Sequence, residues 1–434
     1  MNNLRIFIYF YTSFFLVFCE DYVYNIDTFL EWGLKNNLKL SSLIETSKLV
    51  KNKIKFIAKI DIDKDKELMK IPFTLMLNLS KTLELINLKD LNKQFKEFHR
   101  LNITYKPDKI DFRKEESFLS YILYLVNHKP KKYKKTKFFE IYEKYLETLK
   151  KYYPKSPLFF PPRQIEYLAG SFLDKSIDDI KKIYQDEINI YSNKTYFKKE
   201  LDFDEYVHYR LAINKYGLNI SNHWTLVPFL NYFEDNYNQY NANYTIEKDG
   251  IKIFSNKEIK KGEEIILASP KKTNIISYIM EGKTNEKLVD YFTEYSISAF
   301  SPGLYYQYGI NDKKYFTDYY VNIMEKDFDL QLTKIYKDNA EMLNGDGSDV
   351  WAYDITEMNI NVYKEHFESI TLDKIYDIYY DTDDRINIER IIRGERKIII
   401  EADDKINKIL DKLIEEENKM KRKKRQQREN NSEL

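Results

Sequence analysis

The stretch IKIFSNKEIKKGEEIILASPKKTN, residues 251–274, decides the fold. Its first residues alternate between apolar and polar side chains, and Asp249-Gly250 directly before them predicts the turn of a β-hairpin with the preceding YTIEK. KGEEI, residues 261–265, predicts a tight turn that enters another strand at 263–268. The chain therefore contains a β-rich region here, beside long segments with helical spacing.

A second stretch, LVPFLNYFEDN at residues 226–236, begins as a strand and ends in polar side chains. Its apolar start predicts a strand over 226–231. Asn231, Glu234 and Asp235 then place an amide and two carboxylates at the end of that strand. We interpret this cluster as a candidate binding site, because a few convergent polar groups beside apolar residues are typical of ligand pockets.

The composition is that of a globular and nearly neutral chain. Of its 434 residues 43% are hydrophobic, which is enough for two or three domains with their own cores. The 70 basic and 69 acidic side chains leave a net charge of +1, which excludes a whole-molecule field that steers nucleic acid. Five histidines are scattered without a His-x-x-x-His pair, so we expect no metal site.

The two ends of the chain carry conflicting targeting signals. Arg5 precedes an apolar run at residues 6–18, which predicts a secretory signal peptide over residues 1–19; an uncleaved anchor is the alternative. A cleaved chain would lose Cys19, its one cysteine, and with it any disulfide, Cys-ligated zinc or cysteine nucleophile. KMKRKKRQQR, residues 419–428, is typical of nuclear-import or nucleic-acid-binding segments. We expect the secretory pathway rather than the nucleus, and no transmembrane helix after signal cleavage, because the signal peptide is the more specific pattern.

Helical spacing dominates the rest of the chain. Helices are expected at residues 25–50, from about 84 to 152, from near Pro162, at 177–216, and from about 285 into the basic tail. Further short strands are expected in KIKFIAKIDI and ELMKIP, between residues 53 and 72. The pattern predicts an α+β fold, in which a β-rich domain is interrupted by a helical insertion and followed by an all-helical C-terminal domain.

Several of these segments together resemble the SET domain of the RuBisCO large-subunit methyltransferase type. VKNKIKFIAKIDIDKDKELMKIP, residues 50–72, looks like its opening, and the stretches at 226–236 and 251–274 look like its second half. FFEIYEKYLETLKKYYPKSPLFFPPRQIEYLAGSFL, residues 138–173, is similar to the helical insertion of that family. The likeness covers roughly residues 26–415 and is weaker after residue 320.

The resemblance implies a division of the chain and an activity. The implied parts are a signal peptide at 1–19, the first half of the SET domain at 26–80, a helical insertion at 81–222, the second half at 223–284, a substrate-binding-like helical domain at 285–415 and a basic tail at 416–434. Members of the family move a methyl group from S-adenosyl-L-methionine (SAM) to lysine, or in some members histidine, of protein substrates.

The cofactor motifs depart from the family pattern at the first hairpin. The family's Gly-x-Gly falls at Lys53-Ile54-Lys55, where two lysines would fill the cofactor cradle or repel the sulfonium. The family's Ser-Arg pair corresponds to Tyr209-Arg210. Arg210 therefore remains to pair with the carboxylate of the cofactor.

The polar cluster at 226–236 also departs from that pattern. The family's Asp-x-x-Asn-His maps onto Asn231, Glu234 and Asp235, so two carboxylates replace the Asn-His pair that holds SAM. The resemblance thus makes Arg210, Asn231, Glu234 and Asp235 the positional equivalents of cofactor-binding residues.

The tyrosine positions of the family are changed as well. The catalytic tyrosine corresponds to Ser269, and Pro270 after it removes a backbone donor. The second tyrosine corresponds to a position in 281–283, and Tyr278 lies one helical turn earlier. No catalytic residue is therefore assigned.

We predict a SET-fold protein that has lost SAM binding and catalysis and acts as a protein-binding or scaffold module without a cofactor. The alternative is an active SAM-dependent protein-lysine methyltransferase with a drifted site, which uses Arg210 for the cofactor and Tyr278 near the amine. The expected partner is a protein, bound as partner or substrate, and no specific nucleic acid is expected. A third and weaker hypothesis is nucleic-acid binding through the basic tail.

Overall fold

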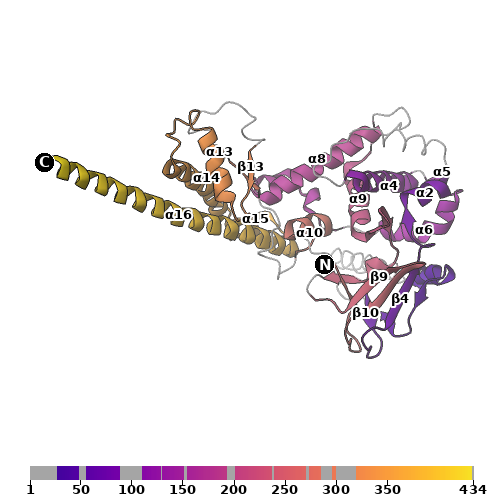
Figure 1. Cartoon of the computed structure of the whole chain (residues 1–434). Coiled ribbons are helices and arrows are strands. Elements are labelled where there is room, and N and C mark those ends of the chain that lie inside the picture. The colour runs from indigo at the N-terminus through magenta and orange to yellow at the C-terminus, as the bar shows by residue number, and fades with distance from the viewer. Residues whose placement is uncertain are drawn as a thin grey trace, which may run out of the picture. The chain divides into compact units, whose positions relative to one another are not determined.

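A computed structural model describes residues 27–47, 55–87, 110–128, 130–150, 154–192, 201–236, 239–269, 273–284, 296–299 and 319–432 (Figure 1). The chain forms two compact units, one of Met1–Pro154 with Lys181–Lys271 and one of Lys155–Ile180 with Lys272–Leu434. Strands gather in the first unit and helices dominate the second, so the α+β fold class is confirmed. The expected signal peptide at 1–19 lies outside the described residues.

The largest sheet of the first unit among the described residues has six strands. In spatial order its strands are β1 (Lys39–Leu40), β4 (Glu67–Pro72), β10 (Gly250–Ser255), β9 (Ala242–Glu247), β11 (Ile266–Ala268) and β8 (Glu234–Asn236). The predicted hairpin is confirmed as β9 and β10, which pair antiparallel with Gly250 opposite Glu247, but its turn is formed by Lys248 and Asp249 rather than by Asp249 and Gly250. Only glycine fits at position 250, because a Cβ there would lie 2.2 Å from the backbone oxygen of Ile71 on β4.

Two smaller sheets complete the β structure of the first unit. One pairs β2 (Ile44–Thr46) with β3 (Phe56–Ala58), and the other has the order β5 (Leu77–Asn78), β7 (His223–Leu226), β6 (Gly217–Ile220). The strand predicted over 226–231 is wrong, because β7 ends at Leu226 and a 3-10 turn, η2 (Leu230–Tyr232), follows. Pro228 cannot donate to a strand partner, and Phe229 has a left-handed backbone with φ of 72°.

Aromatic packing holds this left-handed residue in place. The ring of Phe229 stacks on Phe29 with 4.3 Å between centroids, and Trp32 lies beside both. A Cβ on Gly33 would lie 2.4 Å from the Phe229 ring, so the helix at 27–35 needs glycine here to come close. This helix is shorter than the one predicted over 25–50, because β1 and β2 follow it.

The further helices of the first unit are, in chain order, α2 (Leu79–Ile86), α4 (Ile110–His128), α5 (Pro130–Tyr133), α6 (Lys137–Lys150), the second part of α8 (Phe172–Ser192) and α9 (Phe203–Tyr216). Helix α9 is buried over most of its length and packs against α4 and α6. Helices and strands share one apolar core, which includes Phe56, Tyr121 and Tyr206. The burial of this large aromatic core supplies most of the driving force for folding of the unit.

The second unit is mainly helical and is organised along one long helix. It contains η1 (Pro157–Phe159), α7 (Pro162–Glu166), the first part of α8, α10 (Asn274–Glu281), the paired strands β12 (Ser296–Ser298) and β13 (Tyr320–Asn322), α13 (Phe328–Asp338), α14 (Asp349–Ser369), α15 (Leu372–Ile378) and α16 (Thr382–Ser432). Helix α16, drawn in yellow in Figure 1, packs against α14, α15 and α10 along its first half.

Candidate functional site

Three short backbone segments of the first unit bring Lys55 and two glutamates together. Ile57 of β3 pairs antiparallel with Glu264, and Glu234 of β8 lies opposite Ile266 of β11 in parallel register. Side chains two residues apart share one face of a strand. Lys55, Glu264 and Glu234 therefore point to a common face, although they are far apart in the sequence.

The three side chains form a compact ion cluster. The ammonium nitrogen of Lys55 lies 2.5 Å from Oε1 of Glu264 and 3.2 Å from Oε2 of Glu234. The side chains keep 23%, 30% and 30% of their surface exposed for Lys55, Glu234 and Glu264. Burial by itself would lower the pKa of Lys55, but the hydrogen bond to Glu264 and the charge of Glu234 outweigh it and raise that pKa above its usual 10.5. Lys55 is therefore a protonated cation over the whole physiological range.

The remaining residues of the polar cluster are placed by their backbone. Asn231 lies in η2 and Asp235 in β8, next to Glu234; their side chains lie outside the described part of the structure. Ser269 follows β11, and its backbone nitrogen donates to the backbone oxygen of Asn236 at 3.4 Å. Lys53, Ile54 and Pro270 also lie outside the described residues.

Arg210 lies on α9 in a buried network of its own. Its Nε is 3.1 Å from Oε2 of Glu187 on α8, and its Nη1 is 3.3 Å from Oε2 of Glu116 on α4. The Arg210 side chain is 4% exposed and that of Glu187 is 0% exposed. The ring of Tyr184 lies 5.1 Å from the guanidinium carbon, and the hydroxyl of Tyr206 donates to Glu187 at 2.7 Å. The ion pairs of Arg210 thus join three helices, and they go to Glu187 and Glu116 rather than to Glu234.

Tyr278 lies on α10 of the second unit. Its hydroxyl donates to Oδ1 of Asp384 on α16 at 2.9 Å. Burial and the charge of Asp384 raise the pKa of Tyr278 far above its usual value, so the hydroxyl stays protonated. Gly282 ends α10 with φ of 69°, and a Cβ there would lie 2.7 Å from the backbone of Lys155. This glycine therefore has a structural role as a helix cap.

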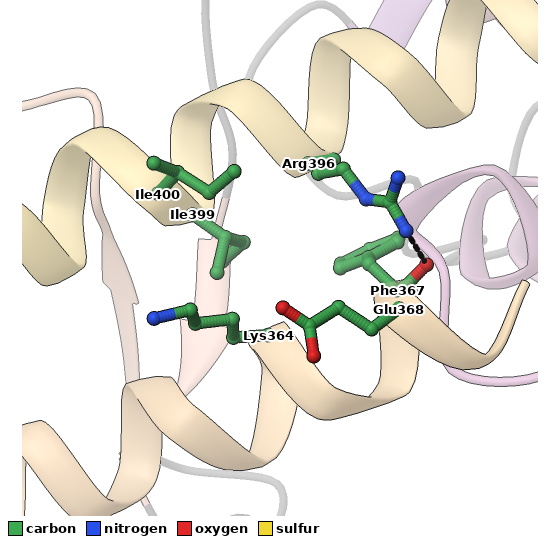
Figure 2. A pocket seen from close by; sticks show the side chains of 6 residues that line it. All are labelled: Lys364, Phe367, Glu368, Arg396, Ile399 and Ile400. Atoms are coloured by element: carbon green, nitrogen blue, oxygen red, sulfur yellow. Dashed lines mark hydrogen bonds between the residues drawn. The ribbon is translucent and has the colours of Figure 1, made fainter.

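The second unit also contains two neighbouring hollows along α16. The first, of about 200 Å³, lies between α14 and α16 and is lined by Lys364, Phe367, Glu368, Arg396, Ile399 and Ile400. Figure 2 shows these side chains facing one another from the two helices, with Nη2 of Arg396 donating to the backbone oxygen of Phe367 at 2.8 Å. The second hollow, of about 540 Å³, is lined by Ile370, Thr371, Asp373, Ile375, Glu389, Ile392, Arg393 and Arg396.

These two hollows share Arg396 and are lined by apolar residues together with cations and carboxylates. We call the two hollows together the α16 groove. Its apolar residues and its mixture of cations and carboxylates suit an extended peptide better than a single small charged ligand.

Comparison with solved structures identifies the fold. Over 90% of its length the chain superposes on the structure of Rubisco LSMT bound to AdoMet, of which it covers 93%, with a TM-score of 0.59 and 13% sequence identity. It also covers 91% of the SET domain of LSMT bound to lysine and AdoHcy, over 88% of its own length, with a TM-score of 0.57 and 14% identity. The chain has the fold of this SET protein. No family model and no curated protein matches its sequence.

The described residues support neither a metal site nor a membrane-spanning helix. No three His, Cys, Asp or Glu side chains converge there into a group that could hold a metal ion. Nor does any helix in them combine the length and the apolar character needed to cross a bilayer.

The sequence indicated two of the three clustered residues as site positions but not the third, Glu264. Lys55 was expected at a cofactor position, and Glu234 was expected at another. Glu264 belongs to KGEEI, from which we predicted only a tight turn that enters a strand. The pairing of Ile57 with Glu264 gives this residue its place beside Lys55. The alternation of side chains along the strand that follows the turn is the signal that could have revealed it.

Proposed function

We propose that this SET-fold chain binds a protein partner and transfers no methyl group. The observation that carries the proposal is the ammonium of Lys55 held between Glu234 and Glu264. The resemblance places Lys55 and Glu234 at two cofactor positions, and here they are bonded to each other. By this resemblance, the two side chains fill positions at which the family binds SAM.

The side chains of this cluster make the arrangement unfavourable for SAM. The cluster has one cation and two carboxylates, so Lys55 would repel the positive sulfonium of SAM while the two glutamates would attract it. The obstacle is therefore the long side chain of Lys55 at a position where the family has glycine, held in place by its bonds to both glutamates. The residues present therefore do not suit SAM, and we derive no methyl-transfer step through it.

The alternative, an active methyltransferase, needs two other residues that are already engaged. Arg210 would have to leave Glu187 and Glu116 to reach a cofactor carboxylate. Tyr278 would have to give up its hydrogen bond to Asp384 to work near an amine. The loss of such a buried partner is costly in each case, because the remaining group stays buried without compensation.

Calorimetric titration of SAM into the full chain tests the proposal. We expect no binding heat up to about 1 mM SAM, which corresponds to a binding free energy weaker than about 4 kcal/mol. Lys55→Ala removes the resident cation. The matched control is Lys70→Ala, because Lys70 also lies between two carboxylates, 2.9 Å from Glu247 and 2.8 Å from Asp249, but not at a cofactor position.

Two results would contradict the proposal. The first is micromolar SAM affinity of the wild-type chain. The second is methyl incorporation into a protein substrate that is lost in Tyr278→Phe, a variant that keeps the ring and removes the hydroxyl. Gain of SAM affinity in Lys55→Ala but not in Lys70→Ala would identify Lys55 as the obstacle.

The protein-binding part of the proposal concerns the α16 groove. A displayed library of random peptides, selected on the full chain, supplies probes for this groove. We expect selected peptides to lose at least about tenfold in affinity for Ile400→Glu, because a charge at the groove wall opposes an apolar contact. Ile386→Glu is the control: Ile386 is 43% exposed on the same helix, close to the 41% of Ile400, but does not line the groove. Equal losses in both variants would place the peptide site elsewhere.

A further inference from the structure

The last part of α16 has no role in the fold or in the groove. Among the side chains of this helix that the structure describes, Leu410 is the last buried one, and residues 418–427 are all exposed. The helix nevertheless continues to Ser432. Figure 1 shows this end of α16 running on past α13 and α14, the other long helices of its unit.

Charge is distributed unevenly along this exposed end. Residues 415–417 are three glutamates, and two of them pair with lysines one turn later: Glu415 with Lys419 at 3.6 Å and Glu417 with Lys421 at 2.7 Å. The following segment, 422–425, consists of four consecutive cations, and the next acidic residue in the sequence is Glu429. We call residues 419–428, with seven cations and no carboxylate, the basic rod.

The helical form of the basic rod sets its charge density. A helix rises about 1.5 Å per residue, so seven cations lie within about 14 Å, or about one charge every 2 Å along the axis. Duplex DNA carries about one phosphate charge per 1.7 Å of its axis. Like charges three and four residues apart on a helix repel one another. A bound polyanion of similar charge density would reduce this repulsion between the cations of the rod.

The arrangement of the cations around the helix favours a ligand that surrounds it. Successive residues turn by about 100°, so consecutive cations at 422–425 point to all sides of the rod. A flat anionic membrane would meet only one side, and the rod offers it no apolar face apart from the exposed Met420. The major groove of B-form DNA is about 12 Å wide, admits a helix and has phosphates along both of its edges.

We propose that the basic rod of α16 binds duplex DNA through its phosphates, without preference for sequence. This binding surface is separate from the cluster of Lys55 and from the α16 groove, and it goes beyond the proposed protein-binding function. The contact is electrostatic, so its affinity falls steeply with salt.

The test measures binding of the full chain to a mixed-sequence duplex by fluorescence anisotropy over a range of salt concentrations. The test variant replaces four rod cations: Arg422→Gln, Lys423→Gln, Lys424→Gln and Arg425→Gln. Glutamine keeps a good helix propensity, and circular dichroism checks that α16 is retained. The control removes four charges from the chain's other basic segment: Lys131→Gln, Lys134→Gln, Lys135→Gln and Lys137→Gln.

The two variants have the same net charge, so a general charge effect would move both equally. We expect the rod variant to bind at least about tenfold more weakly near 100 mM salt, with a slope of log affinity against log salt smaller by up to about 3.6. The control should keep both values. Equal affinities of rod variant and wild type would overturn the proposal.

Two further outcomes would also overturn it. Binding of the wild-type chain to vesicles that contain phosphatidylserine, with no binding to the duplex, would make an anionic membrane the partner. A change of oligomeric state in the rod variant, seen by sedimentation without any duplex affinity in the wild type, would make the rod a contact between copies of the chain.

Discussion

Arg210 and Lys55 each lie between two glutamates, and the two sites differ in how much water reaches them. Arg210 is 4% exposed, and its partner Glu187 is fully buried. Lys55 keeps 23% of its side chain exposed, and both of its partners keep 30%. The charges are alike, and the surroundings are not.

The difference separates an ion pair enclosed by helices from one that solvent reaches. The network of Arg210 links α4, α8 and α9 within the helical part of the first unit, so we expect its ion pairs to affect the stability of the folded chain. The cluster of Lys55 lies where strands come together at a surface that solvent reaches, so its charges could be exchanged for those of a ligand. The resemblance expects a cofactor contact at both sites, but only the carboxylates around Lys55 lie where solvent reaches them.

Removal of a partner from the buried site should have the largest effect. Glu187→Gln leaves the guanidinium of Arg210 with Glu116 alone, and we expect a loss of about 3–5 kcal/mol in the free energy of unfolding. Urea denaturation measures it. The control is Glu205→Gln on the exposed side of α9, where Glu205 pairs with His128 and the change should stay within about 0.5 kcal/mol. A loss below about 1 kcal/mol for Glu187→Gln would remove the contrast with Lys55.

Burial on the same helix also predicts sensitivity to acid. His208 is buried, which lowers its pKa from 6.5 to about 4. A histidine with a lowered pKa is held neutral in the folded state, so protonation favours the unfolded chain. Its contribution to the free energy of unfolding is therefore fully present above pH 6.5 and is lost as the pH falls towards 4. The shift corresponds to about 3 kcal/mol. His208→Gln should abolish this part of the acid loss in denaturation curves at pH 7 and 4.5, and the exposed His223→Gln should not.

The Lys55 cluster should contribute much less to stability. Exposed and half-exposed ion pairs contribute at most about 1 kcal/mol, so Lys55→Ala should lower the free energy of unfolding by no more than that. A double-mutant cycle with Glu264→Ala isolates the pair. A coupling energy above about 3 kcal/mol would mean that Lys55 belongs to the fold in the same way as Arg210.

The smallest effect is the alkaline titration of the same pair. The pKa of Lys55 is raised above 10.5, so the stabilisation is fully present below pH 10.5 and is lost as the pH rises through the higher value of the folded chain. The coupling of Lys55 and Glu264, a fraction of about 1 kcal/mol at pH 8, should fall at pH 11. An unchanged coupling would mean that contact rather than charge joins the two side chains.

The sequence predicted the parts of the fold that local chemistry determines. Asp249-Gly250 predicted a hairpin because Asp-Gly is a favoured turn pair, and β9 and β10 confirm the hairpin, although Lys248 and Asp249 form its turn and Gly250 already belongs to β10. The strand at 226–231 could not be predicted correctly from apolar residues alone. It ends early because Phe229 takes a left-handed conformation, and that conformation depends on aromatic partners about 200 residues away in the chain.

Long-range pairing also limits what could be predicted of the site. The positions of Lys55 and Glu234 were read from the motifs, but their ion pair depends on the parallel register of β8 and β11. The partners of Arg210 come from α4 and α8, 94 and 23 residues away. No pattern near Arg210 indicates that two carboxylates will enclose it.

The stacking of Phe29 on Phe229 has a consequence for synthesis of the chain. The aromatic face of the first described helix can begin to pack when α6 is made, because Phe29 stacks on Tyr145 and Trp32 donates to the backbone oxygen of Ile141. Its last aromatic partner, Phe229, follows about 200 residues after Phe29. At about 5–20 residues per second the ribosome needs roughly 10–40 s to add those residues. The aromatic cluster around this helix is therefore completed in two stages that are set by the order of translation.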